Sequence, residues 1–305
     1  MDRKTALAIG VTLLLWASAF AGIRAALRDY SPAHLALGRF LVASSILAVV
    51  AVWKQTRFPD WRDTPRIILT GFVGITLYHI ALNFGEMTVS AGAASFIVNT
   101  VPIFTTLLSI VFLNERVRLL GWLGMLVSFS GVCLIALGET DQLHFDKGAF
   151  AILAAAVCQS LYFVLQKPLL RKYSVLSVVC YAIWAGTISL IVFLPGLAAQ
   201  VRFAPLPSTL AIVYLGVFPS AIAYLCWSHG LSKMGASKAS SFLFIVPVVA
   251  IVIAFIWLHE IPSWLSLVGG AIALAGVAIC IGFGKHRHEP QQDAVPVGMP
   301  KGAGA

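Results

Sequence analysis

Two ionisable side chains lie deep inside long apolar segments of this chain, where they could bind a solute or a proton. Arg39 lies about two helical turns inside the second apolar segment. His79 lies about two thirds of the way along the third, with Tyr78 before it and Asn83 one turn later. A guanidinium can hold a carboxylate through two parallel hydrogen bonds, and an imidazole can exchange a proton near neutral pH. We therefore predict that Arg39 binds an acidic substrate group and that His79 is a proton relay, with Tyr78 and Asn83 beside it in a cavity.

Both residues also have structural explanations. Arg39 could extend its side chain to the lipid headgroups, or it could pair with Glu86 or Asp29. His79 could remain neutral and bond to a hydroxyl or carbonyl group, as buried polar groups usually do. The partners that these two side chains find in the fold decide between the alternatives.

A block of sequence that carries a proline in its middle and a glutamate at its end occurs twice, at residues 91–115 and 236–260. Pro102 and Pro247 occupy the same place in the two copies. Proline removes a backbone hydrogen bond inside a helix, so we expect a kink or local unwinding. In a membrane the freed carbonyl groups need partners in protein or in a water-lined cavity, which predicts that the prolines line a substrate cavity. The alternative is a static kink that only shapes the bundle.

The acids at the ends of apolar segments are candidates for gate or coupling residues. Glu115 and Glu260 end the two copies, and Glu86 follows the third apolar segment. Such carboxylates could alternate between basic partners and the partly positive N-termini of neighbouring helices. The simpler alternative is a solvated acid at the membrane boundary, as Arg116 directly after Glu115 indicates.

Aromatic and amide side chains within the apolar segments would complete a cavity lining, although packing in the core is the default for each of them. These further candidates are Trp16, Asn99, Tyr162, Tyr224 and Phe244.

The composition places all these residues in a membrane protein. The chain of 305 residues is 59% hydrophobic and 11% charged, with a mean hydropathy of +0.92. Soluble domains carry roughly 25% charged residues, so a soluble globule is excluded. The net charge of +9 comes from Lys and Arg spread over short connections, which argues against a nucleic-acid partner. The five cysteines lie singly in apolar runs without metal-ligand spacing, so we expect no metal and no cofactor.

The apolar segments predict an all-α integral membrane protein with ten transmembrane helices, since about 20 residues cross the hydrocarbon core. We expect a cytoplasmic start at residues 1–4, a first five-helix repeat at 5–138, a second at 148–284 and a disordered cytoplasmic tail at 285–305. The predicted spans are residues 5–27, 33–53, 66–85, 91–113, 119–137, 148–168, 175–196, 208–230, 236–258 and 263–283.

The distribution of basic residues predicts the orientation. With the N-terminus in the cytoplasm, sixteen Lys and Arg residues fall on the cytoplasmic side and four on the other. Cytoplasmic loops carry such an excess, so both termini are predicted to be cytoplasmic.

The internal repeat and this orientation together predict the mechanism. Positions 145 residues apart match along much of the chain, including four pairs of glycines. Five spans per copy is an odd number, so the second copy enters the membrane from the opposite side. Inverted repeats of this kind form a central site that opens to either face by alternating access.

Several local motifs together resemble the EamA-like family of the drug/metabolite transporter (DMT) superfamily. They are Trp16-Ala17-Ser18, Gly38-Arg39-Phe40, the Pro102 to Glu115 block with Arg116 after it, the glycine-patterned segment from Gly121 to Gly138, and Trp257-Leu258-His259-Glu260. The resemblance covers about residues 5 to 284. It implies export of amino acids and related metabolites or drugs, and its more distant relatives carry nucleotide sugars or phosphorylated sugars.

The sequence therefore predicts a secondary transporter of a bacterial-type inner membrane that exports amino acids or their derivatives, with proton antiport as its coupling. Its partners would be a small-molecule substrate, membrane lipids and protons, and both a monomer and a homodimer fit the sequence. A membrane-embedded lipid-modifying enzyme, a structural membrane subunit and a lipid or drug flippase are the alternatives. An enzyme would need clustered acids or histidines, which these scattered residues do not supply.

Overall fold

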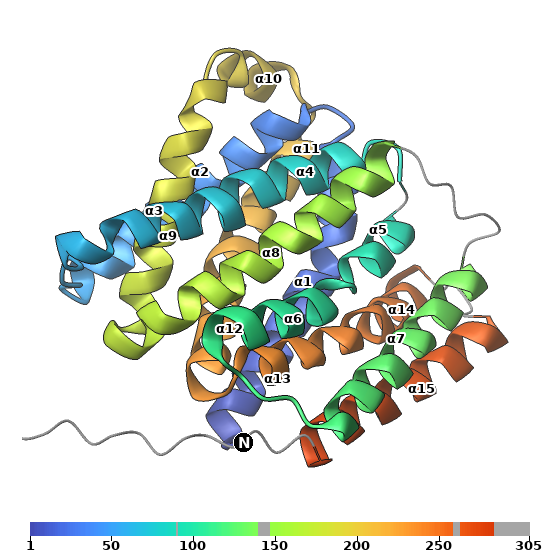
Figure 1. Ribbon diagram of the computed structural model, residues 1–305. Coiled ribbons are helices and arrows are strands. Elements are labelled where there is room, and N and C mark those ends of the chain that lie inside the picture. Colours follow the sequence, from blue (N-terminus) through green and yellow to red (C-terminus); the bar gives the residue numbers. More distant parts are fainter. Residues whose placement is uncertain (90, 140–146, 259–262, 284–305) are drawn as a thin grey trace, which may run out of the picture.

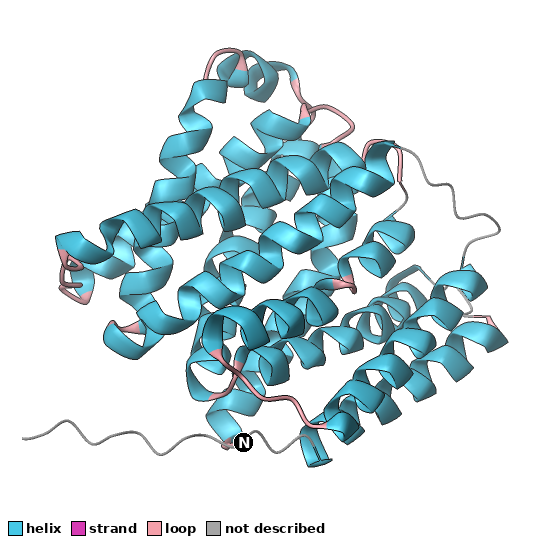
Figure 2. Ribbon diagram, in the orientation of Figure 1, coloured by secondary structure: helices cyan, strands magenta, loops and turns pink. Residues whose placement is uncertain are grey.

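The structure is a computed structural model that describes residues 1–89, 91–139, 147–258 and 263–283. Within these residues every regular element is a helix, and short loops join the helices into one bundle (Figures 1 and 2). The helices of the first part of the chain are α1 (Arg3–Ala26), α2 (Pro32–Trp53), η1 (Trp61–Asp63), α3 (Thr64–Gly71), η2 (Phe72–Leu77), α4 (Tyr78–Gly85), α5 (Ala91–Val98), α6 (Val101–Leu113) and α7 (Leu119–Glu139).

The second part repeats the order of the long helices with two extra short elements, α10 in a connection and the 3₁₀ turn η5 before α14. Its helices are α8 (Lys147–Lys172), α9 (Val175–Leu190), η3 (Ile191–Phe193), α10 (Leu197–Phe203), α11 (Leu206–Leu215), η4 (Gly216–Ile222), α12 (Ala223–Lys233), α13 (Ala236–Ser241), η5 (Phe242–Ile245), α14 (Val246–Leu258) and α15 (Trp264–Phe283).

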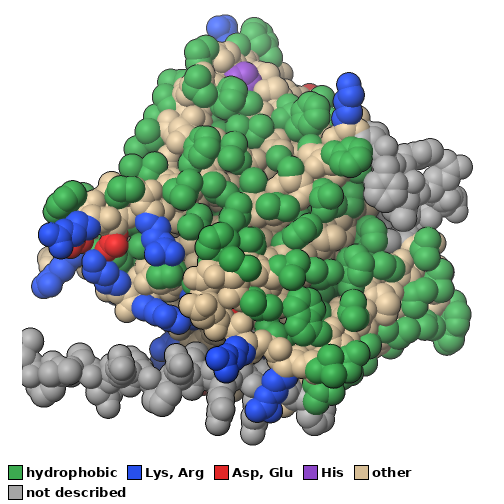
Figure 3. Space-filling view, in the orientation of Figure 1, with side chains coloured by type: hydrophobic (Ala, Val, Ile, Leu, Met, Phe, Trp, Pro, Cys, Tyr) green, Lys and Arg blue, Asp and Glu red, His purple; other side chains and the backbone are tan. Residues whose placement is uncertain are grey.

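The helices have the length and apolarity of membrane spans. Eight helical stretches in the described ranges are long and apolar enough to cross a membrane. The helices α7 and α15, at the places of two further predicted spans, contain shorter apolar stretches of residues 119–135 and 267–282. The outer surface of the bundle is largely hydrophobic, whereas most Lys and Arg on the face shown lie along its lower and left edges (Figure 3). This pattern defines a multi-pass membrane protein.

Polar caps start several of these helices. The Asp2 carboxylate accepts a hydrogen bond from the Thr5 backbone N–H, 3.1 Å away, and Ser31 and Ser174 cap α2 and α9 in the same way. A side-chain acceptor at this position satisfies one of the free N–H groups of the first turn. The apolar runs therefore become helices with defined starting points.

Two π-helical turns interrupt spans at matching places in the two parts of the chain. The turn η2 begins directly after Gly71, and η4 begins at Gly216, which is 145 residues later. A π turn widens the helix and leaves backbone groups free for other partners. One of them is the carbonyl oxygen of Pro219 in η4, which accepts a hydrogen bond of 3.3 Å from the Trp16 indole.

The two repeated prolines follow two further interruptions. The helix α5 ends at Val98 and α6 begins at Val101, so the break lies directly before Pro102. In the second part, the 3₁₀ turn η5 directly precedes α14, whose second residue is Pro247. Each proline thus lies in the first turn of a helix, where its missing N–H costs no intrahelical bond.

The helices α7 and α15 cross with their backbones in contact. A Cβ atom built on Gly124 would lie 2.8 Å from the Gly276 carbonyl oxygen, and one built on Gly131 would lie 2.5 Å from that of Gly269. Only glycine fits such a close approach. Since position 124 meets 276 and position 131 meets 269, the two helices run antiparallel. The pairs 124 and 269, and 131 and 276, are also related by the offset of 145 residues.

Candidate functional site

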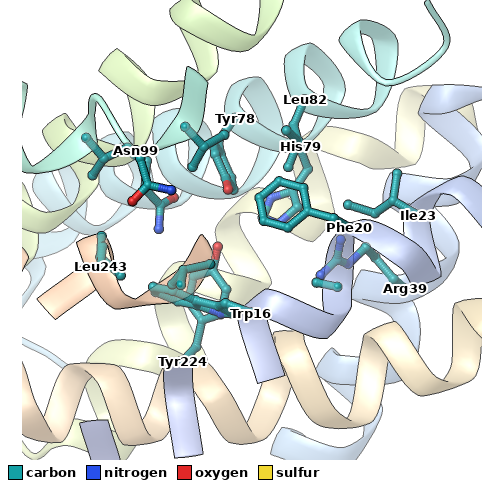
Figure 4. A pocket seen from close by; sticks show the side chains of 15 residues that line it. Trp16, Phe20, Ile23, Arg39, Tyr78, His79, Leu82, Asn99, Tyr224 and Leu243 are labelled. Carbon is teal, nitrogen blue, oxygen red and sulfur yellow. The ribbon is translucent and has the colours of Figure 1, made fainter. Parts of the chain in front are cut away.

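A cavity of about 50 Å³ lies inside the bundle, where helices from both parts of the chain meet (Figure 4). On a scale of 10–15 Å³ per water, it has room for roughly three to five water molecules. Its lining comes from α1, α2, α4, α8 and α12 and from the interrupted spans α5–α6 and α13–α14. The lining residues are Trp16, Ala19, Phe20, Ile23, Arg39, Tyr78, His79, Leu82, Val98, Asn99, Val101, Gln159, Tyr224, Leu243 and Val246.

The two parts of the chain supply matching positions to this lining. His79 and Tyr224 are 145 residues apart, and so are Val98 and Leu243. The cavity therefore lies between two similar halves, but the side chains that it receives from them differ.

Arg39 reaches the cavity from α2 and is only 2% exposed. Its Nε–H donates to the Ser220 hydroxyl at 2.9 Å, and its guanidinium carbon lies 5.5 Å from the centre of the Phe40 ring. Across the described ranges, no carboxylate lies within 4.0 Å of Arg39, and the ion pairs are those of Lys172 with Asp60 and Asp63. Among the described residues, the predicted alternative of an ion pair with Glu86 or Asp29 is therefore not found.

His79 is buried between aromatic rings at one wall of the cavity. Its Nδ1 lies 2.9 Å from the Ile75 carbonyl oxygen, which can only accept, so Nδ1 carries the hydrogen of the neutral ring. The rings of Phe40 and Tyr78 each lie 4.5 Å from the imidazole, in edge-to-face arrangements. This geometry fixes the tautomer and leaves Nε2 as the atom that can exchange a proton in the cavity.

Three polar atoms at the cavity have no hydrogen-bond partner in the described part of the chain. They are Asn99 Oδ1, Gln159 Oε1 and the Tyr224 hydroxyl oxygen, and all three are buried. The amide of Asn99 is held in place because its Nδ2 donates to the Ser95 carbonyl oxygen at 2.7 Å. Buried polar groups are nearly always paired, so this cluster is a candidate place for a bound solute or water.

Gln159 was missed by sequence reasoning. The only signal for it was an uncharged amide in the middle of an apolar span, and that signal does not tell which way the side chain faces.

Trp16 anchors the aromatic wall opposite His79 (Figure 4). Its ring lies 5.7 Å from Tyr224 in an edge-to-face contact and stacks on Phe163 at 6.3 Å. The hydrogen bond from its indole to Pro219 fixes the ring further. The wall is therefore apolar and rigid, and the polar groups lie beside it.

The remaining predicted cavity residues lie outside the lining. Asn83 is buried one turn beyond His79 and donates to the Pro32 carbonyl oxygen at 2.9 Å. Tyr162 packs against Gly74, and its hydroxyl accepts a hydrogen bond from Gln166. Phe244 belongs to a cluster with side chains of α7 and α15. The lining residues nearest to the two prolines are their neighbours Val101 and Val246, and not Pro102 and Pro247 themselves.

The end of the bundle that carries the start of α1 is closed by Lys167 of α8, and we call it the Lys167 end. The Lys167 ammonium is buried and donates to the carbonyl oxygens of Leu231 and Met234, both at 2.5 Å. These carbonyl groups lie at the C-terminus of α12. A cation at this place satisfies carbonyl groups that have no partner within the helix.

Glu115 closes the same end from the other half of the chain. Its carboxylate accepts hydrogen bonds from the backbone N–H groups of Ala236 at 2.6 Å and Ser237 at 3.1 Å. The first turn of α13 is thus bound to the end of α6. Glu260, the matching acid in the second copy, lies outside the described residues.

The opposite end carries the same contact with different side chains, and we call it the Arg24 end. Arg24 Nη1 donates to the carbonyl oxygens of Glu86 at 3.0 Å and Val89 at 3.4 Å. These residues precede Leu231 and Met234 by 145 positions. The Glu86 side chain is fully buried, and its carboxyl oxygens have no hydrogen-bond partner among the residues that the structure describes.

In the described ranges, no three His, Cys, Asp or Glu side chains come together as a metal site.

These features define a class of multi-pass helical membrane protein with an internal cavity that both halves line. The chain belongs to the EamA-like transporter family, whose model matches residues 3–137 and 146–282. The transporter YdfC of Bacillus subtilis, which is named as uncharacterized, is 47% identical over 86% of each chain. A probable terminal-alkyne amino-acid exporter of Streptantibioticus cattleyicolor is 41% identical over 90% of this chain and 93% of its own.

A transporter of Archaeoglobus fulgidus, also named as uncharacterized, is 31% identical over 91% of this chain and 99% of its own. A solved crystal structure of another protein has the same fold, with a TM-score of 0.75 at 19% identity over 93% of this chain and 98% of the other. The family and these names indicate a transporter rather than an enzyme.

Proposed function

We propose that this protein is a secondary transporter that exports amino acids or closely related small metabolites by alternating access. The main support for the proposal is the Arg39 guanidinium, which is buried at the cavity and has no carboxylate partner within the described ranges. An unpaired buried cation is costly, so the site favours a substrate that brings an acidic group. The relative named as a probable amino-acid exporter supports this class of substrate.

The rest of the lining would accommodate a small solute that has its polar groups on one side and an apolar group on the other. The carboxylate would bind Arg39, and the unpaired oxygens of Asn99, Gln159 and Tyr224 would accept hydrogen bonds from an ammonium group. The apolar wall of Trp16 and its neighbours would receive the side chain of the substrate. A volume of about 50 Å³ favours small substrates in this conformation.

We infer that the chain crosses the membrane ten times as two inverted repeats of five helices. The antiparallel crossing of α7 and α15, which occupy matching places in the two repeats, supports the inversion. The gathering of most Lys and Arg along the lower and left edges of the face shown in Figure 3 supports a cytoplasmic Lys167 end with both termini inside. The Arg24 end then faces outward, and a bacterial-type inner membrane is the location that we propose.

Alternating access would require the two ends to open in turn. Glu115 is the gate residue that we propose at the Lys167 end, because its two hydrogen bonds join α6 of the first repeat to α13 of the second. His79 is the candidate proton relay of the cavity, with Nε2 as the atom that would exchange the proton. Antiport of a proton against the substrate is the coupling that we propose.

The direct test is transport of labelled amino acids by the purified protein in liposomes. Arg39→Met should lower uptake of amino acids at least about tenfold, because the charge-assisted hydrogen bonds to the carboxylate are lost. Arg202→Met, at an exposed arginine on α10, is the matched control and should leave uptake unchanged. The amide derivatives of the same amino acids should be transported poorly by the native protein.

Equal transport of amino acids and their amides would contradict the role of Arg39. A native protein that moves no amino acid, but moves a drug or a labelled lipid, would instead assign it to efflux or lipid flipping. A second experiment compares the metabolites released by cells that express the native protein with those released by cells that express His79→Ala. It extends the test to substrates other than the labelled amino acids.

A further inference from the structure

We propose that Glu86 is a proton-binding site that controls closure of the Arg24 end. The proposal rests on the proposed function, because a transporter that works by alternating access must open and close this end. It concerns a residue outside the cavity lining. Glu86 lies one turn beyond Leu82, which does line the cavity, and so it lies between the cavity and the surface.

The environment of Glu86 accommodates a neutral carboxylic acid and not a carboxylate. The side chain is 0% exposed, neither carboxyl oxygen has a hydrogen-bond donor, and no cation lies within 4.0 Å in the described part of the chain. A buried ionised carboxylate needs a paired cation or several hydrogen bonds. Since Glu86 has neither, it carries a proton in this closed conformation.

The charged and titratable groups around Glu86 are close by but bound elsewhere. Arg24 on α1 and Arg39 on α2 are the cations that face it, and Tyr78 lies on its own helix. Arg24 donates to backbone carbonyl oxygens, one of them that of Glu86 itself, and Arg39 donates to a serine hydroxyl. Lys147 at the start of α8 is exposed. A cation that could pair with the carboxylate is therefore present, but it is engaged while the end is closed.

Opening of the Arg24 end would expose Glu86 to water and free Arg24 from the carbonyl groups that it binds. When Arg24 leaves the carbonyl groups of α4, water reaches Glu86 and its O–H bond can break, with the proton passing to that water. The resulting carboxylate then pairs with the released Arg24 guanidinium. Closure requires the reverse transfer, so acid on this side favours the closed form and base favours the open form. In the proposed orientation, an acidic exterior would speed closure after the substrate has left.

The other end of the bundle provides an internal comparison. Leu231 occupies the position that matches Glu86. The Leu231 carbonyl oxygen accepts a hydrogen bond from Lys167, and the Glu86 carbonyl oxygen accepts one from Arg24. The Lys167 end therefore has no carboxyl group at the position that Glu86 occupies at the Arg24 end. The pH dependence that Glu86 confers should thus belong to the Arg24 end.

Infrared spectroscopy of the purified protein tests the protonation state without any substrate. The native protein should show the carbonyl-stretch band of a protonated carboxylic acid at neutral pH, and Glu86→Gln should lack it. Glu115→Gln, at an acid with two hydrogen-bond donors, is the matched control and should retain the band. A spectrum without this band at neutral pH, or a band that Glu86→Gln retains, would overturn the proposal. Glu86→Leu serves if the glutamine variant does not fold.

Closure is measured by alkylation of a single cysteine with a membrane-impermeant reagent. Ile23→Cys reports access to the cavity from the Arg24 end, in a background without the native cysteines. Exposed Arg202→Cys corrects for the pH dependence of the thiol itself. The corrected rate should rise at least about fivefold from about pH 5 to pH 8, and Glu86→Gln should reduce the rise to less than about twofold. Leu231→Gln should leave the rise unchanged.

A rise that persists in Glu86→Gln would contradict the proposal. Neither measurement uses an amino acid, so a failure of the proposed substrate class would appear only in the liposome flux assay and would leave these two results in place.

Discussion

The two ends of the bundle share one backbone contact and differ in the side chains around it. In each, a basic side chain binds two carbonyl oxygens at the end of another helix, from α1 to the end of α4 and from α8 to the end of α12. The carbonyl positions match at an offset of 145 residues. At the Lys167 end the cation is buried and Leu231 lies beside it. At the Arg24 end the cation is exposed and Glu86 is buried instead.

This difference distinguishes contacts that both halves need for stability from side chains that occur at one end only. A contact present in both halves, such as the cation on the carbonyl groups, closes and stabilises the helix ends. A side chain present in only one half, such as Glu86, can make the opening of that end depend on pH. The same reasoning applies in the cavity, where His79 faces a matching Tyr224.

The largest expected effect concerns the part that both halves share. A Cβ atom at Gly71 would lie 2.9 Å from the Gly186 backbone nitrogen, and one at Gly216 would lie 2.7 Å from the Arg39 carbonyl oxygen. Gly71→Val and Gly216→Val should each lower the free energy of unfolding in detergent by about 3 kcal/mol, because backbone atoms cannot move aside. Titration with a denaturing detergent measures the loss.

Gly10→Ala is the control for these variants, because nothing lies within 4 Å of a Cβ atom there. It should leave the stability equal or slightly higher, as alanine favours a helix. If only one of the two valine variants were destabilised, the two halves would not share the same packing.

A smaller effect should distinguish the cations of the two ends. Lys167→Met removes the donor of two buried carbonyl oxygens, and we expect a loss of about 2 kcal/mol in the free energy of unfolding. Arg24→Met should cost less, because Arg24 is exposed and water can replace it. The same detergent titration compares the two variants. An equal loss in the free energy of unfolding would show that the exposure of the cation does not decide its contribution to stability.

The smallest effect should come from the gate acid. Glu115→Gln keeps an acceptor oxygen but loses the charge, and charge-assisted hydrogen bonds are roughly twice as strong as neutral ones. We expect the Lys167 end to open more easily by about 1 kcal/mol, which is a roughly fivefold faster alkylation of Ser237→Cys. Alkylation that is no faster than in the parent protein would contradict the proposed role of Glu115 as a gate residue.

The sequence predicted the positions of the long helices closely because each is a long apolar run with polar ends. The predicted spans 91–113 and 236–258, for example, correspond to α5–α6 and α13–α14 with their interruptions before the prolines. The repeat was visible because the glycines that permit close helix contacts recur at a fixed offset. Both signals are local or periodic, and neither depends on knowing which helices are neighbours.

The lining of the cavity was only partly predictable. Arg39, His79, Tyr78, Trp16, Asn99 and Tyr224 lie at the cavity as predicted from their rarity within apolar runs. Gln159 and the burial of Lys167 were missed, because the direction of a side chain depends on contacts with distant segments. Lys167 falls at the end of the predicted span 148–168 and was counted with the cytoplasmic Lys and Arg residues, and the carbonyl groups of Leu231 and Met234 explain its burial.

The glycine crossing of α7 and α15 also bears on the origin of the chain. Gly124 meets Gly276, Gly131 meets Gly269, and each glycine has its own counterpart on the opposite helix. This is the pattern of an isologous interface, in which two identical subunits meet across a two-fold axis. A single five-helix ancestor that inserted in both orientations would pair with itself through this contact.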